Sequence, residues 1–169
     1  MAKPERLVLV DGSWLIYRAF FAIPASFATK AGLPTNATFG FASMFRKLFA
    51  GRMPDRGAVV FDSPAATHRE LKFPAYKAQR PAMPPELAAQ LKSIDRVVLA
   101  HRFPLLRQPG YEADDIIATL ARRGAEAGLE VIIVAGDKDL AQMVGEHVRM
   151  QDTMRDVTYD VELVRKRWG

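Results

Sequence analysis

The chain holds three short apolar runs, at residues 6–10, 57–61 and 129–134. Runs of this length and composition are typical of strands that are buried in a parallel sheet. Each run is followed by carboxylates, and these are Asp11, Asp62, Asp137 and Asp139. One acid after a strand is usually a turn residue. Because the carboxyl ends of parallel strands meet at one edge of a sheet, the repetition predicts an acidic pocket at that edge.

A further group of acids stands at the start of a predicted helix, in the stretch from Gly110 to Ile117. Its acids, three within four residues, are Glu112, Asp114 and Asp115. The helix dipole favours acids in a first turn, which explains one of them but not three. Glu112 and Asp115 share a helix face, whereas Asp114 points elsewhere unless the helix start bends it inward. Crowded carboxylates repel one another, so the pattern favours a divalent cation; an ordinary solvated helix start is the alternative.

The other elements complete an α/β pattern. We expect helices at residues 36–49, 84–98 and 138–144, a strand at 148–151 and a basic amphipathic piece at 161–168. A short strand at residues 103–106 is possible. The order β-α-β-α-α-β-α-β, in one domain over residues 1–169, predicts an α/β fold of three layers. In this fold a mainly parallel central sheet carries helices on both faces.

The composition restricts the partners and the kinds of site. The net charge of +5 and the isoelectric point near 9.7 favour a polyanionic partner. Cysteine is absent, which excludes disulfides and zinc–thiolate sites and fits a cytoplasmic protein. No apolar run is long enough to span a membrane, and residues 1–6 lack the apolar core of a signal peptide. We therefore expect no membrane association.

Basic and aromatic residues alternate in the segment after Asp62. They include Arg69, Lys72, Tyr76, Lys77 and Arg80. Cations that hold phosphates and rings that stack on bases are the two components of single-strand binding. Pro74 and Pro81 oppose a stable helix, so we expect a mobile segment, about residues 67–85, that orders on nucleic acid. A solvated linker with chance basic residues is the alternative.

The candidate acids have no histidine or cysteine beside them in the sequence. Oxygen-only ligation selects the hard cations Mg²⁺ or Mn²⁺ over zinc. Two such ions about 4 Å apart can activate a water and stabilise the leaving oxygen of a phosphodiester. An acidic metal pocket in a polyanion-binding protein therefore indicates a nuclease. A phosphatase with Asp11 as nucleophile is disfavoured, because that chemistry usually needs a second acid two positions later, where Ser13 stands.

Five motifs resemble, in order, those of the bacterial 5′–3′ exonucleases, which form the N-terminal nuclease of DNA polymerase I and are related to flap endonucleases. The motifs cover nearly the whole chain and lie at residues 10–13, 60–62, 67–81, 110–115 and 136–140. The resemblance implies a PIN-like, resolvase-like fold and Mg²⁺-dependent cleavage, with Mn²⁺ as a substitute and two ions in the complete site. The substrates it implies are DNA with 5′ ends, flaps or nicks.

The resemblance also assigns roles to individual residues. The metal site would consist of Asp11, Asp62, Glu112, Asp114, Asp115, Asp137 and Asp139. The phosphate grip and a helical arch would contain Arg18, Arg69, Tyr76, Lys77 and Arg80, with Lys72 beside them. Lys77 would also join the catalytic group. We further expect a monomer in the bacterial cytoplasm, associated with the nucleoid, and a possible polymerase domain in the natural protein.

Two features depart from the family pattern. His68 stands where the family commonly has phenylalanine. We therefore expect His68 to stack less strongly than that phenylalanine would. The sequence ends at Gly169, before the helix–hairpin–helix region and the Asp-rich motif that completes the second metal site. We therefore expect this lobe alone to cleave flap DNA slowly, and better with Mn²⁺ than with Mg²⁺. A non-catalytic lobe that binds DNA or a partner, and a PIN-type ribonuclease, are the alternatives.

Overall fold

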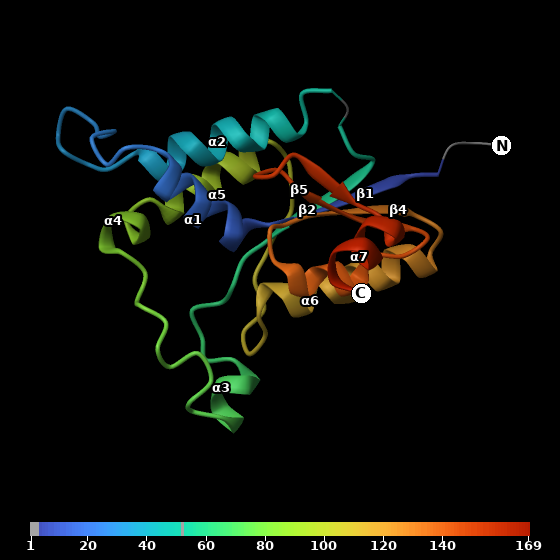
Figure 1. The fold of residues 1–169 in the computed structure, drawn as a ribbon. Helices are drawn as coiled ribbons and strands as arrows, with labels where there is room; N and C mark the ends of the chain where they lie inside the picture. The colour runs from blue at the N-terminus through green and yellow to red at the C-terminus, as the bar shows by residue number, and fades with distance from the viewer. Residues whose placement is uncertain (1–3, 52) are drawn as a thin grey trace.

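The computed structural model describes residues 4–51 and 53–169; residues 1–3, which begin the stretch tested above for a signal peptide, lie outside these ranges. A six-stranded sheet with the order β3-β2-β1-β4-β5-β6 forms the centre (Figure 1). Neighbouring strands pair in parallel, except that β6 is antiparallel to β5. The strands are β1 (Arg6–Asp11), β2 (Arg56–Val60), β3 (Leu105–Leu106), β4 (Glu130–Val134), β5 (Val148–Asp152) and β6 (Val157–Tyr159).

Helices cover both faces of this sheet (Figure 1). On one face lie α1 (Gly12–Ala22), α2 (Asn36–Leu48) and α5 (Leu91–Ala100), and on the other lies α6 (Ala113–Glu126). The shorter helices are α3 (His68–Lys72), α4 (Pro85–Ala88), the 3₁₀ helix η1 (Lys138–Met143) and α7 (Val161–Trp168). The predicted three-layer, mainly parallel α/β fold is therefore confirmed. Within the described ranges, no helix has the length and apolar character needed to cross a membrane.

Side-chain alternation along β1 divides the core between the two faces. Val8 and Val10 pack toward α1 and α2, whereas Leu9 packs toward α6. On α6 the buried residues recur every three or four positions, as an amphipathic helix requires, and they are Ala113, Ile117, Ala121 and Gly124. A Cβ at Gly124 would lie 2.9 Å from the Leu7 side chain and 3.0 Å from the Val131 side chain, so a larger residue here would require these side chains to shift.

The strand order creates a topological switch point between β1 and β4. The chain runs outward from β1 through β2 to β3, and then returns to the other side for β4 and β5. Ligands of open α/β sheets bind outside the carboxyl ends of the strands at such a point. Asp11 ends β1, while Asp62 and Asp137 follow β2 and β4. The fold thus brings the acids to the predicted edge.

Several local features differ from the predicted elements. The helix expected at residues 84–98 forms as α4 and α5, and the helix expected at 138–144 is the 3₁₀ helix η1. The expectation that Asp11 lies in a turn after the first strand is wrong. Asp11 instead caps helix α1, and its side chain accepts a hydrogen bond from the Trp14 backbone N–H. The segment 67–85, called the arch segment below, contains the short helix α3 before Pro74, since proline excludes only the helix that would continue through it. The antiparallel strand β6 was not predicted; its three residues are too few for a clear alternation.

Candidate active site

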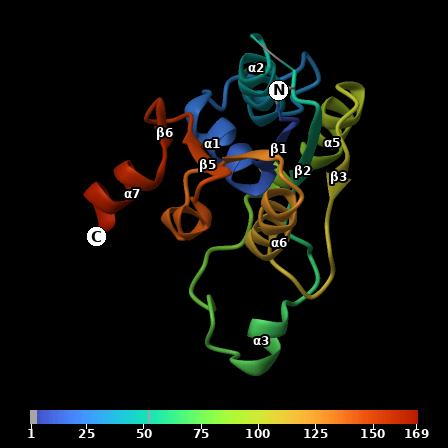
Figure 2. The ribbon, with the colours of Figure 1, turned by 90° about the vertical axis from the view of Figure 1, so that its right-hand side faces the viewer.

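A cleft of about 920 Å³ opens at the carboxyl edge of the sheet. The ends of the central strands and the starts of α1, α6 and η1 surround it, and the arch segment extends away from the sheet beside it (Figure 2). Six of the seven acids predicted for the metal site line this cleft: Asp11, Asp62, Glu112, Asp114, Asp137 and Asp139. Asp115 is not among the lining residues. Six of the predicted acids therefore lie in one shared cleft.

Three of these acids are held by helix starts. Asp11 Oδ1 accepts from the Trp14 N–H at 2.9 Å, Asp62 Oδ1 from the Ala113 N–H at 2.8 Å, and Asp137 Oδ1 from the Asp139 N–H at 2.9 Å. Each bond uses a backbone donor that the first helical turn leaves unsatisfied. No described residue donates a hydrogen bond to Oδ2 of any of the three. Each of these acids thus uses one oxygen to bind a helix start, and its second oxygen remains available to a ligand.

Burial and mutual repulsion disfavour the charged forms of two acids in the cleft. Burial, together with the charges of Asp114, Asp62 and Asp137, raises the pKa of Asp11 from 3.8 to about 7, although the hydrogen bond from the Trp14 N–H lowers it. Burial likewise raises the pKa of Asp114 to about 6, helped by Asp137 and Asp62. The protein alone therefore leaves part of this negative charge without compensation.

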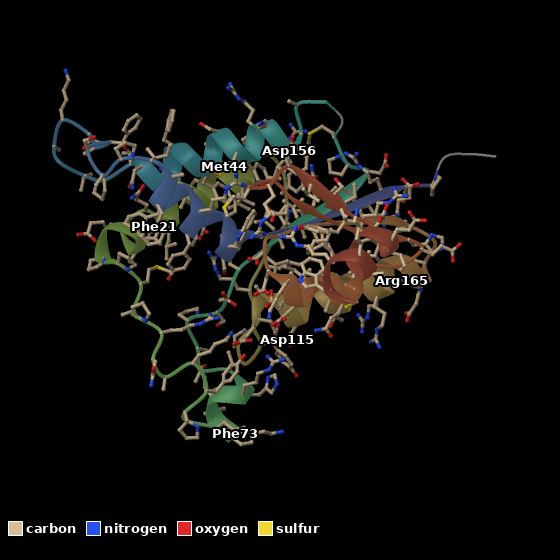
Figure 3. The ribbon with its side chains drawn as sticks, in the orientation of Figure 1. Phe21, Met44, Phe73, Asp115, Asp156 and Arg165 are labelled. Atoms are coloured by element: carbon tan, nitrogen blue, oxygen red, sulfur yellow. The ribbon has the colours of Figure 1, made fainter. Side chains whose placement is uncertain are left out.

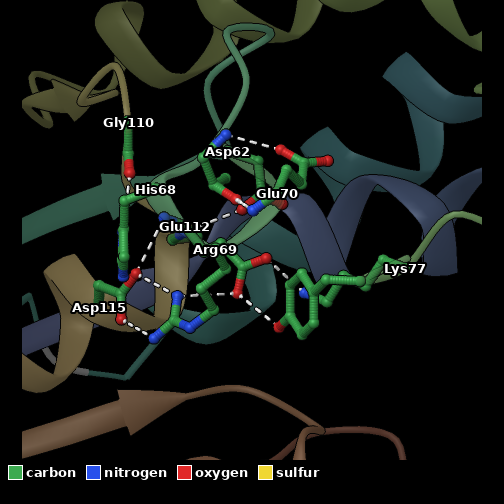
Figure 4. Close-up of polar contacts among 11 residues, drawn as sticks. Asp62, His68, Arg69, Glu70, Lys77, Gly110, Glu112 and Asp115 are labelled. Atoms are coloured by element: carbon green, nitrogen blue, oxygen red, sulfur yellow. Dashed lines mark hydrogen bonds and ion pairs between the residues drawn. The ribbon is translucent and has the colours of Figure 1, made fainter. Parts of the chain in front are cut away.

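Glu112 is the acid of the cleft that the arch segment neutralises. The Lys77 ammonium lies 2.6 Å from Glu112 Oε1, while Arg69 Nη1 and the Tyr76 hydroxyl lie 3.2 and 3.3 Å from Oε2 (Figure 4). Burial lowers the pKa of Lys77, but hydrogen bonds to Glu112 and Tyr76 outweigh it, so that the net pKa is raised. Lys77 has a φ of 56°, a left-handed backbone conformation that is uncommon outside glycine.

Asp115 is the second acid near the start of α6 that pairs with the arch segment. Its oxygens Oδ1 and Oδ2 lie 2.6 and 2.7 Å from Nη2 and Nη1 of Arg69, in a bidentate ion pair (Figure 4). The hydrogen bond from Arg69 lowers the pKa of the Asp115 carboxyl, and the same pair raises the pKa of Arg69. Arg69 thus bonds both Glu112 and Asp115, whereas Glu112 and Asp114 are the two acids of this group that line the cleft.

The remaining basic candidates lie at different distances from the cleft. Arg80 lines it together with Arg69, Tyr76 and Lys77. Arg18 on α1 instead bonds the side chain and backbone of Thr153, and its guanidinium stands 5.4 Å from the centre of the Trp14 ring. Lys72 is exposed on α3 and does not line the cleft. Next to it Phe73 is 70% exposed, where the arch segment is farthest from the sheet (Figure 3).

One wall of the cleft was missed by the sequence predictions. It comes from β5, β6 and α7 and includes Asp152, Arg155, Tyr159, Arg167 and Trp168. Asp152 is only 1% exposed, and its carboxylate accepts from Arg155 at 2.7 Å and from the backbone of Met154. Asp152 ends β5 just as Asp11 ends β1, so the same strand-end signal could have identified it.

The acids surround a common space without converging on one point. Across residues 4–51 and 53–169, no three His, Asp or Glu side chains are arranged so that they could hold a metal ion as they stand. The engagement of Glu112 by Lys77 and Arg69 is one physical reason. A cation bound here would have to draw carboxylates together and compete with these arch cations.

Sequence comparisons identify the family. Residues 6–169 match the family model of the 5′–3′ exonuclease, N-terminal resolvase-like domain. A 5′–3′ exonuclease of Aquifex aeolicus is 43% identical over 165 residues, which cover 98% of this chain and 57% of the relative. A DNA polymerase I of Bacillus caldotenax is 41% identical over 169 residues, covering 98% of this chain and 19% of the polymerase. The chain thus spans just over half of the first relative and about a fifth of the second.

Solved structures show the same fold at low sequence identity. The T5 D15 protein, co-crystallised with metal ions, superposes with a TM-score of 0.66 at 19% identity, over 96% of this chain and 59% of the T5 protein. This likeness agrees with the predicted PIN-like arrangement of sheet and helices. Together with the match over residues 6–169, the strand-end acids and the arch segment place the chain in the 5′–3′ exonuclease family, as the N-terminal resolvase-like domain.

Proposed function

We propose that this chain is the catalytic lobe of a divalent-metal-dependent 5′ nuclease that hydrolyses DNA phosphodiesters at 5′ ends and flaps. The observation that carries the proposal is one cleft with acids on the sheet edge and cations on the arch segment. Carboxylates suit the metal ions of phosphodiester hydrolysis, and arginine and lysine suit the phosphates of the substrate. The family and the names of the relatives, 5′–3′ exonuclease and DNA polymerase I, support the proposal.

The donor set fits Mg²⁺ or Mn²⁺. Oxygen ligands select hard cations, and a divalent ion would relieve the repulsion that raises the pKa of Asp11 and Asp114. The residues that would hold it are Asp11, Asp62, Glu112, Asp114, Asp137 and Asp139. When bound, the cation supplies activation of water and stabilisation of the leaving oxygen. The metal ions in crystals of the T5 D15 protein support this assignment.

The chain's own cations would orient the DNA. Arg69, Tyr76, Lys77 and Arg80 line the cleft. We expect the three cations to bind phosphate oxygens and the ring of Tyr76 to stack on a base. Lys77 stands 2.6 Å from Glu112, so a phosphate held by Lys77 lies next to the acids. Holding the substrate in this orientation lowers the entropic part of the barrier.

Cleavage of a labelled 5′-flap duplex tests the proposal. The wild-type chain should cut the flap in Mn²⁺ and in Mg²⁺ but not in EDTA, and Asp114→Asn should reduce the rate by about 100-fold or more, as loss of a charge-stabilising group does. The matched control is Glu126→Gln, an exposed acid at the far end of the same helix, which should cut like the wild type. Metal-independent cutting, or faster cutting of an RNA version of the substrate, would contradict the proposal.

A further inference from the structure

Asp114 and Asp115 are adjacent at the start of α6, yet their carboxylates have different surroundings. Asp114 lines the cleft, and no described residue donates a hydrogen bond to it. Asp115 does not line the cleft, and both of its oxygens are engaged. Arg69 binds Oδ1 and Oδ2 at 2.6 and 2.7 Å, and the Glu112 backbone N–H donates to Oδ2 at 3.1 Å.

We propose that Asp115 is a positioning residue that orients Arg69 of the arch segment toward the substrate, and that it is not a metal ligand. This inference rests on the proposed nuclease function, because it concerns how that function's phosphate-binding cation is held. It revises the role that the family resemblance assigns to Asp115.

Helix geometry supports different roles for Asp114 and Asp115. Successive residues on a helix point about 100° apart, so Asp114 and Asp115 cannot both face the centre of the cleft from regular helical positions. Asp115 would have to break two charge-assisted hydrogen bonds before it could bind a cation. Its release would also leave Arg69 with Glu112 as its remaining carboxylate partner, at 3.2 Å. For Asp115 to bind a metal ion, its observed pair with Arg69 would therefore have to break.

The bidentate pair fixes where Arg69 points. A guanidinium held at two nitrogens by one carboxylate has a set plane, which a single contact does not impose. In this plane Nη1 also reaches Glu112 Oε2, so the cation lies between the two carboxylates, as Figure 4 shows. Arg69 is on α3, and the preceding residue, His68, donates its backbone N–H to the Gly110 carbonyl at 2.9 Å. Asp115 and Gly110 together hold the base of the arch segment against the start of α6.

The experiment separates metal binding from DNA binding. Titration with Mn²⁺ alone, followed by calorimetry and by the thermal midpoint, is compared for wild type, Asp114→Asn and Asp115→Asn. We expect the Mn²⁺ affinity of Asp115→Asn to lie within threefold of the wild-type affinity, a difference in binding free energy of about 0.7 kcal/mol. Asp114→Asn should lose most of the Mn²⁺ affinity. Arg69→Ala and the double variant Arg69→Ala/Asp115→Asn should bind Mn²⁺ equally, although Asp115 is then released from its partner.

A double-mutant cycle tests the coupling to Arg69. Binding of a fluorescent 5′-flap duplex is measured in EDTA for wild type, Asp115→Asn, Arg69→Ala and the double variant. Asp115→Asn should weaken binding about tenfold in the wild-type background, in line with charge-assisted hydrogen bonds, but change little when Arg69 is already absent. Asp115→Glu, which keeps the charge, should recover part of the loss. A residue that merely supports the fold would act equally in both backgrounds.

The outcomes decide the inference separately from the proposed function. A loss of Mn²⁺ affinity in Asp115→Asn as large as that in Asp114→Asn would make Asp115 a ligand and overturn the inference. The inference would also be overturned if Asp115→Asn weakened DNA binding equally in the presence and absence of Arg69. If Asp115→Asn does not fold, Arg69→Lys takes its place, because lysine cannot form the bidentate pair. It should weaken flap binding and leave Mn²⁺ binding intact, and wild-type flap affinity would overturn the inference. A wild-type chain that binds no Mn²⁺ defeats the proposed function instead, while the DNA cycle still tests the Asp115–Arg69 coupling.

Discussion

The Lys77 ammonium lies 2.6 Å from Glu112 Oε1, so a cation of the arch segment neutralises an acid of the candidate metal site (Figure 4). Both side chains are mostly buried, at 26% and 12% exposed. Screening by water is therefore weaker here than in a surface ion pair. A metal ion would compete with Lys77 for Glu112, and a substrate phosphate would compete with Glu112 for Lys77.

Removing the lysine charge should strengthen metal binding. We expect Lys77→Met to bind Mn²⁺ several-fold more tightly than the wild type, because the ammonium no longer opposes the cation at Glu112. Calorimetry with Mn²⁺ in the absence of DNA measures the change. Lys72→Met is the control, since Lys72 is exposed on α3 outside the cleft and its loss should leave Mn²⁺ affinity unchanged. Equal affinities for wild type and Lys77→Met would show that the ion pair does not compete with the metal.

Phosphate contacts by the arch segment should appear in the salt dependence of binding. Replacing Lys77 and Arg80 with Ala should weaken binding of flap DNA and reduce the slope of log affinity against log salt by about 1 to 2. The matched double variant replaces Arg46 and Lys47, which are exposed at the end of α2, and removes the same charge. Fluorescence anisotropy at four salt concentrations compares the two. Identical slopes would mean that the effect comes from net charge and not from the arch segment.

Asp11 should make the metal-free protein less stable as the pH rises. Its pKa is about 7 in the folded protein and near 3.8 in the unfolded chain, so the folded state binds more protons between these values. The free energy of unfolding therefore falls as pH increases from about 4 to about 7. Asp11→Asn, which can still accept from the Trp14 N–H, should flatten this fall.

Urea unfolding in EDTA at several pH values measures this dependence. Asp156→Asn, a change of an exposed acid whose left-handed φ of 54° asparagine tolerates, should keep the wild-type profile. Excess Mn²⁺ should reverse the slope for the wild type, because the metal binds the deprotonated acids. A wild-type stability that rises between pH 4 and pH 7 in EDTA would contradict the assigned cause.

Close packing beside Asp137 should make Gly136 intolerant of a side chain. A Cβ at Gly136 would overlap the Trp14 indole, which itself lines the cleft. Gly136→Ala should lower the free energy of unfolding by roughly 1–3 kcal/mol, the usual cost of overpacking, and should also weaken Mn²⁺ binding by displacing Asp137. Gly145→Ala meets no atom within 4 Å and serves as the control. Thermal unfolding and Mn²⁺ titration of both variants provide the comparison.

Local sequence determined the sheet and the edge at which the acids gather. The apolar runs that became β1, β2 and β4 specify buried parallel strands, and the carboxyl ends of such strands necessarily share an edge. Asp11, Asp62 and Asp137 could therefore be placed together from their positions alone. The same local signals were insufficient at α1, because Asp followed by Gly is compatible with both a turn and a helix start.

Only the tertiary structure decided how the acids at the start of α6 divide their roles. Helical spacing gives the angle between Asp114 and Asp115, but not which of them faces the cleft. That choice depends on Arg69 and Lys77, which precede their partners by 46 and 35 residues and reach them only after the arch segment folds back. A carboxylate becomes a ligand or an ion-pair partner according to the charges that surround it, and those charges come from distant parts of the chain.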